Sequence, residues 1–331
     1  MDDLGDMGDF GSLGEGMLEV EGLTKWFGGV AVLDDVSFRV GEGEVVGLLG
    51  ENGAGKTTTL RLLSGALYPT AGRITIGGRD LIKSPLAAKR KVGYLPEQLP
   101  LDTGMRVEPY LHYVARLRGL NRRERAEGVR HVLSVCRLDE VTDRNIGALS
   151  RGLKMRVALA QALVHNPELV LLDEPTAGLD PQQVLNMREL ILSLAGHHTI
   201  LFSSHNLTEV SECCNRVVLL KGGRVAAEDA LAALEGRAGE TRMLRLRLSQ
   251  APADPCGELS GLPDVILAEP ADGASPGTVM VTVKPVEGVR ERLAAEVTGK
   301  GWGLCELVEV TESLAEVFQR HAEEREETLA E

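Results

Sequence analysis

The chain has 331 residues, 43% of them hydrophobic, and 36 Lys and Arg residues against 49 Asp and Glu residues give a formal net charge of -13. This length suffices for one large domain and a smaller one, and it argues against a wholly disordered chain. The acidic balance argues against a general nucleic-acid binder, which needs an excess of basic residues on at least one face.

The negative charge is concentrated at the two ends of the chain. Residues 1–16 carry -5 and residues 322–331 carry -4, which leaves -4 for everything between. The first segment is low-complexity Gly, Asp and Leu, so we predict a disordered N-terminus and an acidic C-terminal tail. No apolar run approaches the ~18 residues of a membrane helix. The five cysteines form no CxxC pair, and no secretory signal precedes them, which indicates free thiols in a cytoplasmic protein.

Residues 17–236 are predicted to form the main domain. Residues 17–21 and 36–40 alternate apolar and polar side chains like half-exposed strands, and Val45–Leu49 is a continuous apolar run suited to a strand buried on both faces. Apolar strands then alternate with helical patterns as far as about residue 220, which predicts an α/β fold with a mostly parallel sheet. Apolar residues spaced three and four apart predict a helical insert over about residues 100–165.

A smaller accessory α/β domain is predicted over residues 240–321. A short helix at 230–234 leads to the boundary, which we place near 236–240, where the composition changes. The domain is expected to contain strands at 243–248, 278–283 and 304–310, a helix at 286–297, a loop over 251–277 and a last helix from Ser313, where a capping box begins. It has no evident chemical site, so a regulatory or oligomerisation role is the plain interpretation.

A phosphate-binding loop follows the buried strand directly. Its residues are Gly50, Glu51, Asn52, Gly53, Ala54, Gly55, Lys56, Thr57 and Thr58. The glycines let successive backbone amides face a phosphate chain, and the start of the following helix adds positive potential. In this GxxxxGK[ST] pattern the lysine reaches the outer phosphates and the next hydroxyl binds Mg²⁺. The sequence therefore predicts a nucleoside triphosphate site, with Lys56 and Thr57 in these two roles.

A pair of acids ends a second apolar strand, residues 169–172. Asp173 is expected in the Mg²⁺ coordination sphere, and Glu174 is expected to act as the general base that polarises the attacking water. Two acids at a strand end are usually structural only, but a phosphate loop in the same chain reverses that expectation.

A third motif opens the helix that begins after Ser150. A serine at this position is sufficiently explained as an ordinary N-cap. Together with Gly152, however, its hydroxyl and the exposed amides of the helix start could bind a terminal phosphate held by another molecule.

Taken together, the motifs resemble the ATP-binding subunit of ABC transporters, from about residue 17 to residue 235. Besides the phosphate loop, the Asp173–Glu174 strand and the Leu149–Ser150 signature, the resemblance rests on the segments 94–98, 177–180 and 203–205, in the family's order and spacing. Arg151 and Leu153 depart from the usual Gly and Gln of the signature. Such variants, and the accessory domain, are similar to ATPases that drive separately encoded exporter permeases.

The resemblance implies further roles for single residues. Gln98 would head a loop that senses Mg²⁺ and water and contacts the membrane subunit, and His205 would hydrogen-bond the γ-phosphate. Asp180 would lie at a dimer interface. Phe27 matches the aromatic residue that stacks on adenine, although a core position is the alternative because Trp26 is adjacent.

The function predicted from the resemblance is that of an ATP-hydrolysing subunit that dimerises around two ATP molecules and drives export through a multi-span permease. It would lie on the cytoplasmic face of the membrane, attached through that permease, with no span of its own. Two alternatives remain: a non-transport ABC ATPase acting in translation or DNA repair, and a nucleotide-dependent regulatory protein with little turnover. The single ATPase half and the absence of sustained heptads disfavour the first. Glu174 and His205 disfavour the second, while Arg151 and Leu153 in the signature favour it.

Overall fold

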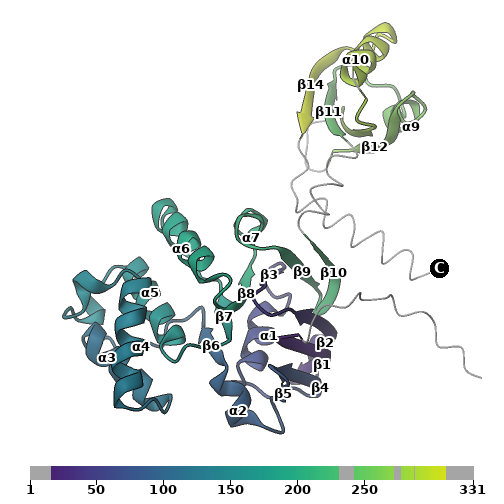
Figure 1. The fold of residues 1–331 in the computed structure, drawn as a ribbon. Helices are drawn as coiled ribbons and strands as arrows, with labels where there is room; N and C mark the ends of the chain where they lie inside the picture. The colour runs from purple at the N-terminus through teal and green to yellow at the C-terminus, as the bar shows by residue number, and fades with distance from the viewer. Residues whose placement is uncertain (1–15, 231–241, 272–276, 287, 311–331) are drawn as a thin grey trace, which may run out of the picture. The chain divides into compact units, whose positions relative to one another are not determined.

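The computed structural model describes residues 16–230, 242–271, 277–286 and 288–310. The chain divides into two compact units, Met1–Asp229 and Ala230–Glu331 (Figure 1). The predicted N-terminal segment, apart from Gly16, and the acidic tail lie outside the described residues, as does the helix predicted from Ser313. In the described part of the chain, no helix is both long enough and apolar enough to span a membrane.

A six-stranded sheet forms the centre of the first unit, with the strand order β10-β9-β3-β8-β7-β6. Its strands are β3 (Val45–Leu49), β6 (Val92–Leu95), β7 (Leu169–Asp173), β8 (Thr199–Ser204), β9 (Arg216–Lys221) and β10 (Arg224–Ala230). The neighbours from β9 to β6 in this order pair in parallel, and all residues of β3 and β7 are buried. The prediction of a mostly parallel sheet is confirmed.

Parallel pairing brings three strand ends to the same edge of this sheet. Leu49 at the end of β3 lies opposite Ser204 of β8, and Asp173 at the end of β7 lies opposite Ser203. The segments that follow these strands therefore begin side by side, as is usual for ligand sites of α/β sheets.

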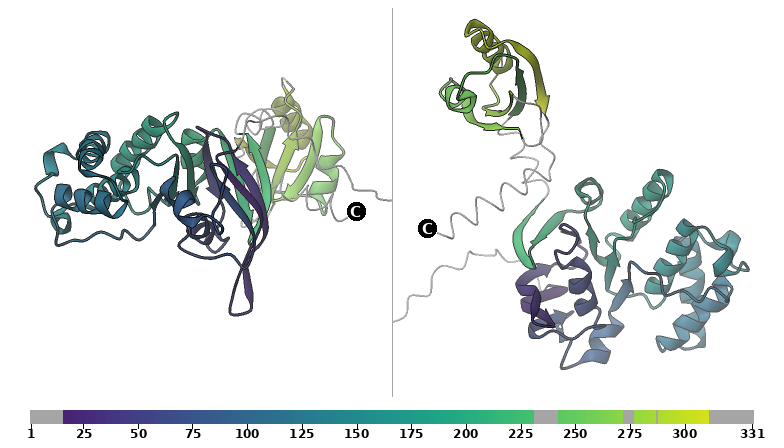
Figure 2. Two further views of the ribbon diagram at one scale, coloured as in Figure 1. Left: turned by 60° about the horizontal axis from the view of Figure 1, so that its bottom comes forward. Right: turned by 180° about the vertical axis from the view of Figure 1, so that it is seen from behind.

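The helices in the described residues 16–229 of the first unit fall into two groups. Four accompany the sheets: α1 (Lys56–Leu63), α2 (Pro85–Arg90), α6 (Pro181–Leu194) and α7 (Leu207–Cys213). The others form the insert: α3 (Val107–Leu117), α4 (Arg122–Val135), the short 3-10 helices η1 (Asp139–Val141) and η2 (Ile146–Ala148), and α5 (Arg151–Leu163). Helices α3, α4 and α5 gather on the far side of the unit from α1 in the views of Figures 1 and 2. Mainly helical structure thus lies where the sequence pattern predicts an insert.

A second sheet in this unit, with the order β2-β1-β4-β5, was not predicted as such. Its strands are β1 (Leu18–Phe27), β2 (Val30–Val40), β4 (Ala71–Ile76) and β5 (Arg79–Asp80), all paired antiparallel. Gly28 and Gly29 form the tight turn between β1 and β2, with φ of 53° and 88°, angles that favour glycine. One core cluster joins both sheets through α1: Leu18 and Ile74 of the antiparallel sheet pack with Leu60 of α1 and Leu48 of β3.

The second unit contains a four-stranded antiparallel sheet with the order β12-β13-β11-β14. Among its described residues, the elements are β11 (Arg242–Leu248), α9 (Pro255–Ser260), β12 (Val265–Pro270), β13 (Thr278–Val283), α10 (Val289–Gly299) and β14 (Leu304–Val310). Leu246, Val281 and Leu293 are among the residues of its own core.

Two predictions for this region were wrong. The segment 251–277, expected to be a loop, contains α9 and β12. The sequence pattern did not show them, because the helix that Asp254 caps is too short to show a period, and β12 exposes the apolar residues Ile266 and Leu267. Ala230, expected to open a helix, ends strand β10, and the other residues of that helix lie outside the described part. The domain boundary near residues 236–240 stays a prediction.

Candidate nucleotide site

The phosphate loop links β3 to α1 and leaves the start of this helix open. Gly55 precedes α1 with φ of 107°, a left-handed conformation that side chains rarely adopt. A Cβ at this position would meet Leu33 Cδ2 at 2.5 Å and the Val32 carbonyl oxygen at 3.1 Å. Glycine is therefore required here both by conformation and by space, and the first amides of α1 remain available to an anion.

Lys56 is held within the loop rather than extended into solvent. Lys56 is only 7% exposed, and its Nζ donates to the Gly50 carbonyl oxygen at 2.7 Å and to the Glu51 carbonyl oxygen at 3.2 Å. The same Nζ lies 3.5 Å from Glu174 Oε1. The ammonium thus sits where the loop encloses the cavity, with a carboxylate as its counter-charge.

Thr57 and Asp173 form a cluster of oxygen ligands. Thr57 Oγ1 donates to Asp173 Oδ1 at 3.0 Å, and Ser203 Oγ donates to the same oxygen at 2.8 Å. Burial, together with the charge of Asp173, raises the pKa of Tyr94 to about 12, so that its hydroxyl 3.5 Å from Asp173 Oδ2 stays protonated. A hydroxyl and a carboxylate are the hard oxygen ligands that Mg²⁺ prefers, so these residues fit that ion.

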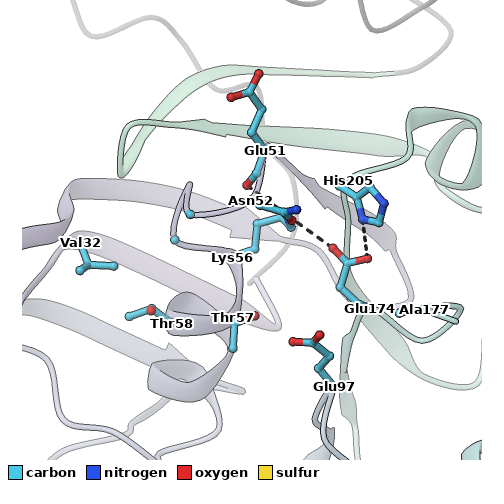
Figure 3. Close-up of a pocket in the computed structure, with 12 residues that line it drawn as sticks. Val32, Glu51, Asn52, Lys56, Thr57, Thr58, Glu97, Glu174, Ala177 and His205 are labelled. Atoms are coloured by element: carbon cyan, nitrogen blue, oxygen red, sulfur yellow. Dashed lines mark hydrogen bonds and ion pairs between the residues drawn. The ribbon is translucent and has the colours of Figure 1, made fainter.

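Glu174 occupies a strained position directly after β7. Its φ of 48° is left-handed, a conformation that non-glycine residues hold only where the surroundings enforce it. Its N–H donates to Ser203 Oγ at 3.1 Å. Its carboxylate lies between Lys56 and His205, with Oε2 2.9 Å from His205 Nδ1 (Figure 3). The Glu174 side chain is 11% exposed and that of His205 is 59% exposed, so the histidine presents its outer part to solvent.

These groups border one cavity of about 440 Å³. It is lined by Val32, Glu51, Asn52, Gly53, Gly55, Lys56, Thr57, Thr58, Glu97, Glu174, Ala177 and His205. Asp173 does not line the cavity but accepts the hydrogen bond of Thr57, Ala54 is a buried residue of the loop itself, and the Gly50 carbonyl oxygen accepts a hydrogen bond from Lys56. The structure therefore brings the phosphate loop together with the end of β7 and the end of β8.

Three residues of the cavity were not predicted: Val32, Glu97 and Ala177. The bend after β6 turns Glu97 toward the cavity, as Figure 3 shows, whereas the predicted Gln98 is exposed and is not among the lining residues. Residue periodicity gives no direction for side chains in a bend, so the sequence could not distinguish the two neighbours. Val32 reaches the cavity through tertiary packing, for which no sequence signal exists, whereas Ala177 begins the segment 177–180 on which the family resemblance partly rests.

Phe27 does not line the cavity, and it is not a core residue either. Phe27 is the last residue of β1, next to the turn of the hairpin, and it is 45% exposed. This exposure excludes the alternative that Phe27 is a core residue. Lys25 Nζ lies 5.0 Å from the centre of the Phe27 ring, within the range of a cation–π contact.

The signature residues lie away from this cavity on the same unit. Ser150 is the N-cap of α5 and accepts a hydrogen bond from the Leu153 N–H at 3.4 Å, while Asp180 caps α6 and accepts from the Gln183 N–H at 3.0 Å. Both cap residues are exposed. Gly152 is covered by the Gln183 side chain, which a Cβ at residue 152 would displace. Ser150 thus acts as the N-cap of α5, and it is exposed to solvent at the start of the helix.

Comparison with known proteins decides the family. A model of the ABC transporter family matches residues 33–177. The chain is 40% identical over 207 residues to the ABC transporter ATP-binding protein NatA of Bacillus subtilis, covering 62% of this chain and 84% of the relative. The chain belongs to the ABC transporter ATP-binding proteins. It is therefore an ATP-binding, ATP-hydrolysing subunit of a transporter.

Two further similarities bear on its role. The chain is 38% identical over 221 residues to the Nod factor export ATP-binding protein I of Paraburkholderia xenovorans, covering 66% of this chain and 73% of that protein. A solved structure of the ATP-binding cassette MJ0796, dimeric and in a post-hydrolysis state bound to ADP and Pi, matches with a TM-score of 0.59 and 25% identity, covering 65% of this chain and 99% of the other.

Proposed function

We propose that this ABC ATPase dimerises head to tail around two ATP molecules and thereby drives export through a partner membrane permease. The observation that carries the proposal is the division of the site. Lys56, Glu174 and His205 line the cavity, whereas the phosphate-binding candidates Ser150 and Gly152 do not. A second copy would place its own Ser150 hydroxyl and helix start over the open side of the cavity. The dimeric relative MJ0796 and the export role in the name of the Nod factor protein support the proposal.

ATP would bind with its phosphates on the loop amides and Lys56. His205 would hydrogen-bond the γ-phosphate, and Phe27 is the proposed adenine platform, an exposed aromatic ring at the end of β1. Thr57 and Asp173 would hold Mg²⁺, which when bound neutralises charge on the phosphates. The loop glycines and the buried Lys56 fit the phosphates of ATP, and the oxygen ligands of Thr57 and Asp173 fit Mg²⁺.

Hydrolysis would use Glu174 as the general base. The attacking water gives its proton to the Glu174 carboxylate while its oxygen bonds to the γ-phosphorus, and the bond from that phosphorus to the bridging oxygen breaks to leave ADP. The fixed φ of Glu174 and the bond of its N–H to Ser203 hold this carboxylate ready. Loss of phosphate would remove the group that both subunits bind, so that the pair reopens.

The permease would receive this motion near the exposed Gln98, next to Glu97 of the cavity. In this arrangement the ATPase lies on the cytoplasmic face of the membrane, attached through its partner. Affinity capture of the tagged chain from detergent-solubilised membranes should retain a multi-span protein. Capture of a ribosomal or DNA-repair complex in its place would favour a non-transport ABC ATPase.

The dimer is tested with Glu174→Gln, which keeps the size of the side chain and removes the base. Sedimentation of this variant with Mg-ATP should give a dimer, and its hydrolysis rate should fall by ~10²-fold or more. Adding Ser150→Ala should weaken dimerisation much more than ATP binding by the monomer, because Ser150 lies outside the cavity. Equal losses in both measurements would argue against a signature that acts across the dimer, and an unchanged hydrolysis rate would remove the role of Glu174.

A further inference from the structure

Arg151 makes a contact that the glycine usual at this position of the signature could not make. Its Nη2 donates to the Ala177 carbonyl oxygen at 2.8 Å. The guanidinium lies against Gly178, where a Cβ would meet Arg151 Cζ at 2.6 Å. The absence of a side chain at residue 178 therefore provides the room that the guanidinium occupies.

The two ends of this contact belong to different parts of the site. Arg151 is the first residue of α5 and directly follows Ser150. Ala177 lines the cavity, and its N–H donates to the Glu174 carbonyl oxygen at 3.1 Å. A continuous chain of contacts thus runs from Ser150 through Arg151 and Ala177 to the residue proposed as the base.

In the dimer proposed above, the two ends would serve different ATP molecules. Ser150 would face the γ-phosphate bound by the partner, while Glu174 of the same chain faces its own ATP. A displacement of the α5 start toward the partner's phosphate would pull on the Ala177 carbonyl group and so move the turn that carries Glu174. The hydrogen bond is charge-assisted because its donor is a guanidinium cation.

We propose that Arg151 is a positioning residue that couples the two ATP sites of the dimer, a proposal that rests on the dimer itself. Occupation of one site would favour the productive position of Glu174 in the other, and such coupling is reciprocal between binding sites. ATP hydrolysis by the full chain should then be cooperative in ATP, with a Hill coefficient between one and two.

The main test compares Arg151→Ala with Lys154→Ala. Lys154 lies one turn further along α5 and lines the same small cavity as Arg151, one of about 390 Å³, so its removal also takes a cation from this surface. Initial ATPase rates of the purified full chain are measured against ATP concentration. Arg151→Ala should lower the Hill coefficient to one, whereas Lys154→Ala should keep the wild-type value. The Kd of the monomer for ATP should change less than twofold in both, because neither residue lines the nucleotide cavity.

Two further variants separate a specific contact from general damage. Arg151→Lys keeps a donor within reach of the Ala177 carbonyl group and should retain part of the cooperativity. Gly178→Ala removes the contact from the other side, because its Cβ would displace the guanidinium. The double variant of Arg151→Ala and Gly178→Ala should be no less cooperative than either single one, as expected when two changes break one interaction.

Failure of this inference is distinguishable from failure of the proposed function. If the Glu174→Gln variant forms no dimer with Mg-ATP, the proposed function is overturned and the coupling with it. If it dimerises but Arg151→Ala keeps the wild-type Hill coefficient, or Lys154→Ala lowers it equally, Arg151 is not the coupling residue. A wild-type Hill coefficient of one would likewise overturn the inference.

Discussion

Ser203 forms hydrogen bonds with both acids of the candidate site, Asp173 and Glu174. Removing its hydroxyl group should therefore lower the rate of ATP hydrolysis, although the substitution Ser203→Ala removes only one oxygen atom. Its Oγ donates to Asp173 Oδ1 at 2.8 Å and accepts from the Glu174 N–H at 3.1 Å, and the residue is fully buried. In Ser203→Ala, Asp173 keeps the hydroxyl of Thr57, but the Glu174 N–H loses its partner. A buried group left without a hydrogen bond costs about 1–3 kcal/mol.

This energy can be converted into an expected rate. If this energy is lost from the stabilisation of the transition state, at ~1.4 kcal/mol for each tenfold change, kcat falls about 5- to 140-fold. The KM for ATP should change by less than about threefold, since Ser203 does not line the cavity. The free energy of unfolding, measured by urea denaturation, should fall by about 1–3 kcal/mol as well.

Ser204→Ala is the matched control. Ser204 is also fully buried and donates to Glu209 at 3.0 Å, but it bonds neither acid. This variant should lose similar stability while keeping kcat within about threefold of the wild type, because it leaves the hydrogen bonds of Ser203 in place. If kcat falls equally in both variants, the effect is one of general stability, and if Ser203→Ala keeps its kcat, the hydroxyl does not position Glu174.

Three further predictions concern single residues. Gly55→Ala should reduce the affinity for ATP at least tenfold by equilibrium binding, because φ of 107° and the contact with Leu33 force the loop to shift; wild-type affinity would contradict this. Thr57→Ala should raise the Mg²⁺ concentration for half-maximal ATPase rate several-fold, and an unchanged value would remove Thr57 from the metal site. Burial, aided by the charge of Arg118, lowers the pKa of His165 from 6.5 to about 4, so the unfolded chain binds more protons between these pH values. The free energy of unfolding should therefore fall from pH 6.5 toward pH 4 by at most ~3 kcal/mol from this residue, and urea unfolding of His165→Leu should lack that part; an identical pH dependence would contradict it.

The parts of the site that depend on local sequence were predictable. The phosphate loop is defined by a strand, three glycines and a helix start within 14 residues, Val45–Thr58, so its conformation follows from neighbours along the chain. The acids at the end of β7 follow a strand that is buried throughout. Both segments reach the cavity or lie directly behind it, as their positions at strand ends predict.

The parts that depend on tertiary contacts were not predictable. Glu97 lines the cavity in place of Gln98, and both residues lie in a bend, where residue periodicity gives no side-chain direction. The antiparallel sheet needed pairing between segments such as Leu18 and Ile76, which no local pattern specifies. The hydrogen bond from Arg151 to Ala177 joins residues on two elements, and only the fold brings them together.

The geometry of the acids depends on strand register more than on any single motif. Asp173 lies opposite Ser203 in the pairing of β7 with β8, and Leu49 lies opposite Ser204 in the pairing of β3 with β8. Successive side chains of a strand point to opposite faces, so a slip of one residue that paired Asp173 with Phe202 would place a side chain without a hydroxyl beside the acids. The Glu174 N–H would then lose the hydroxyl to which it donates, and the left-handed conformation of Glu174 would lose the support of this hydrogen bond. The residues of the motifs supply the chemical groups, and the register of β8 between β3 and β7 places the hydroxyl that holds both acids in position.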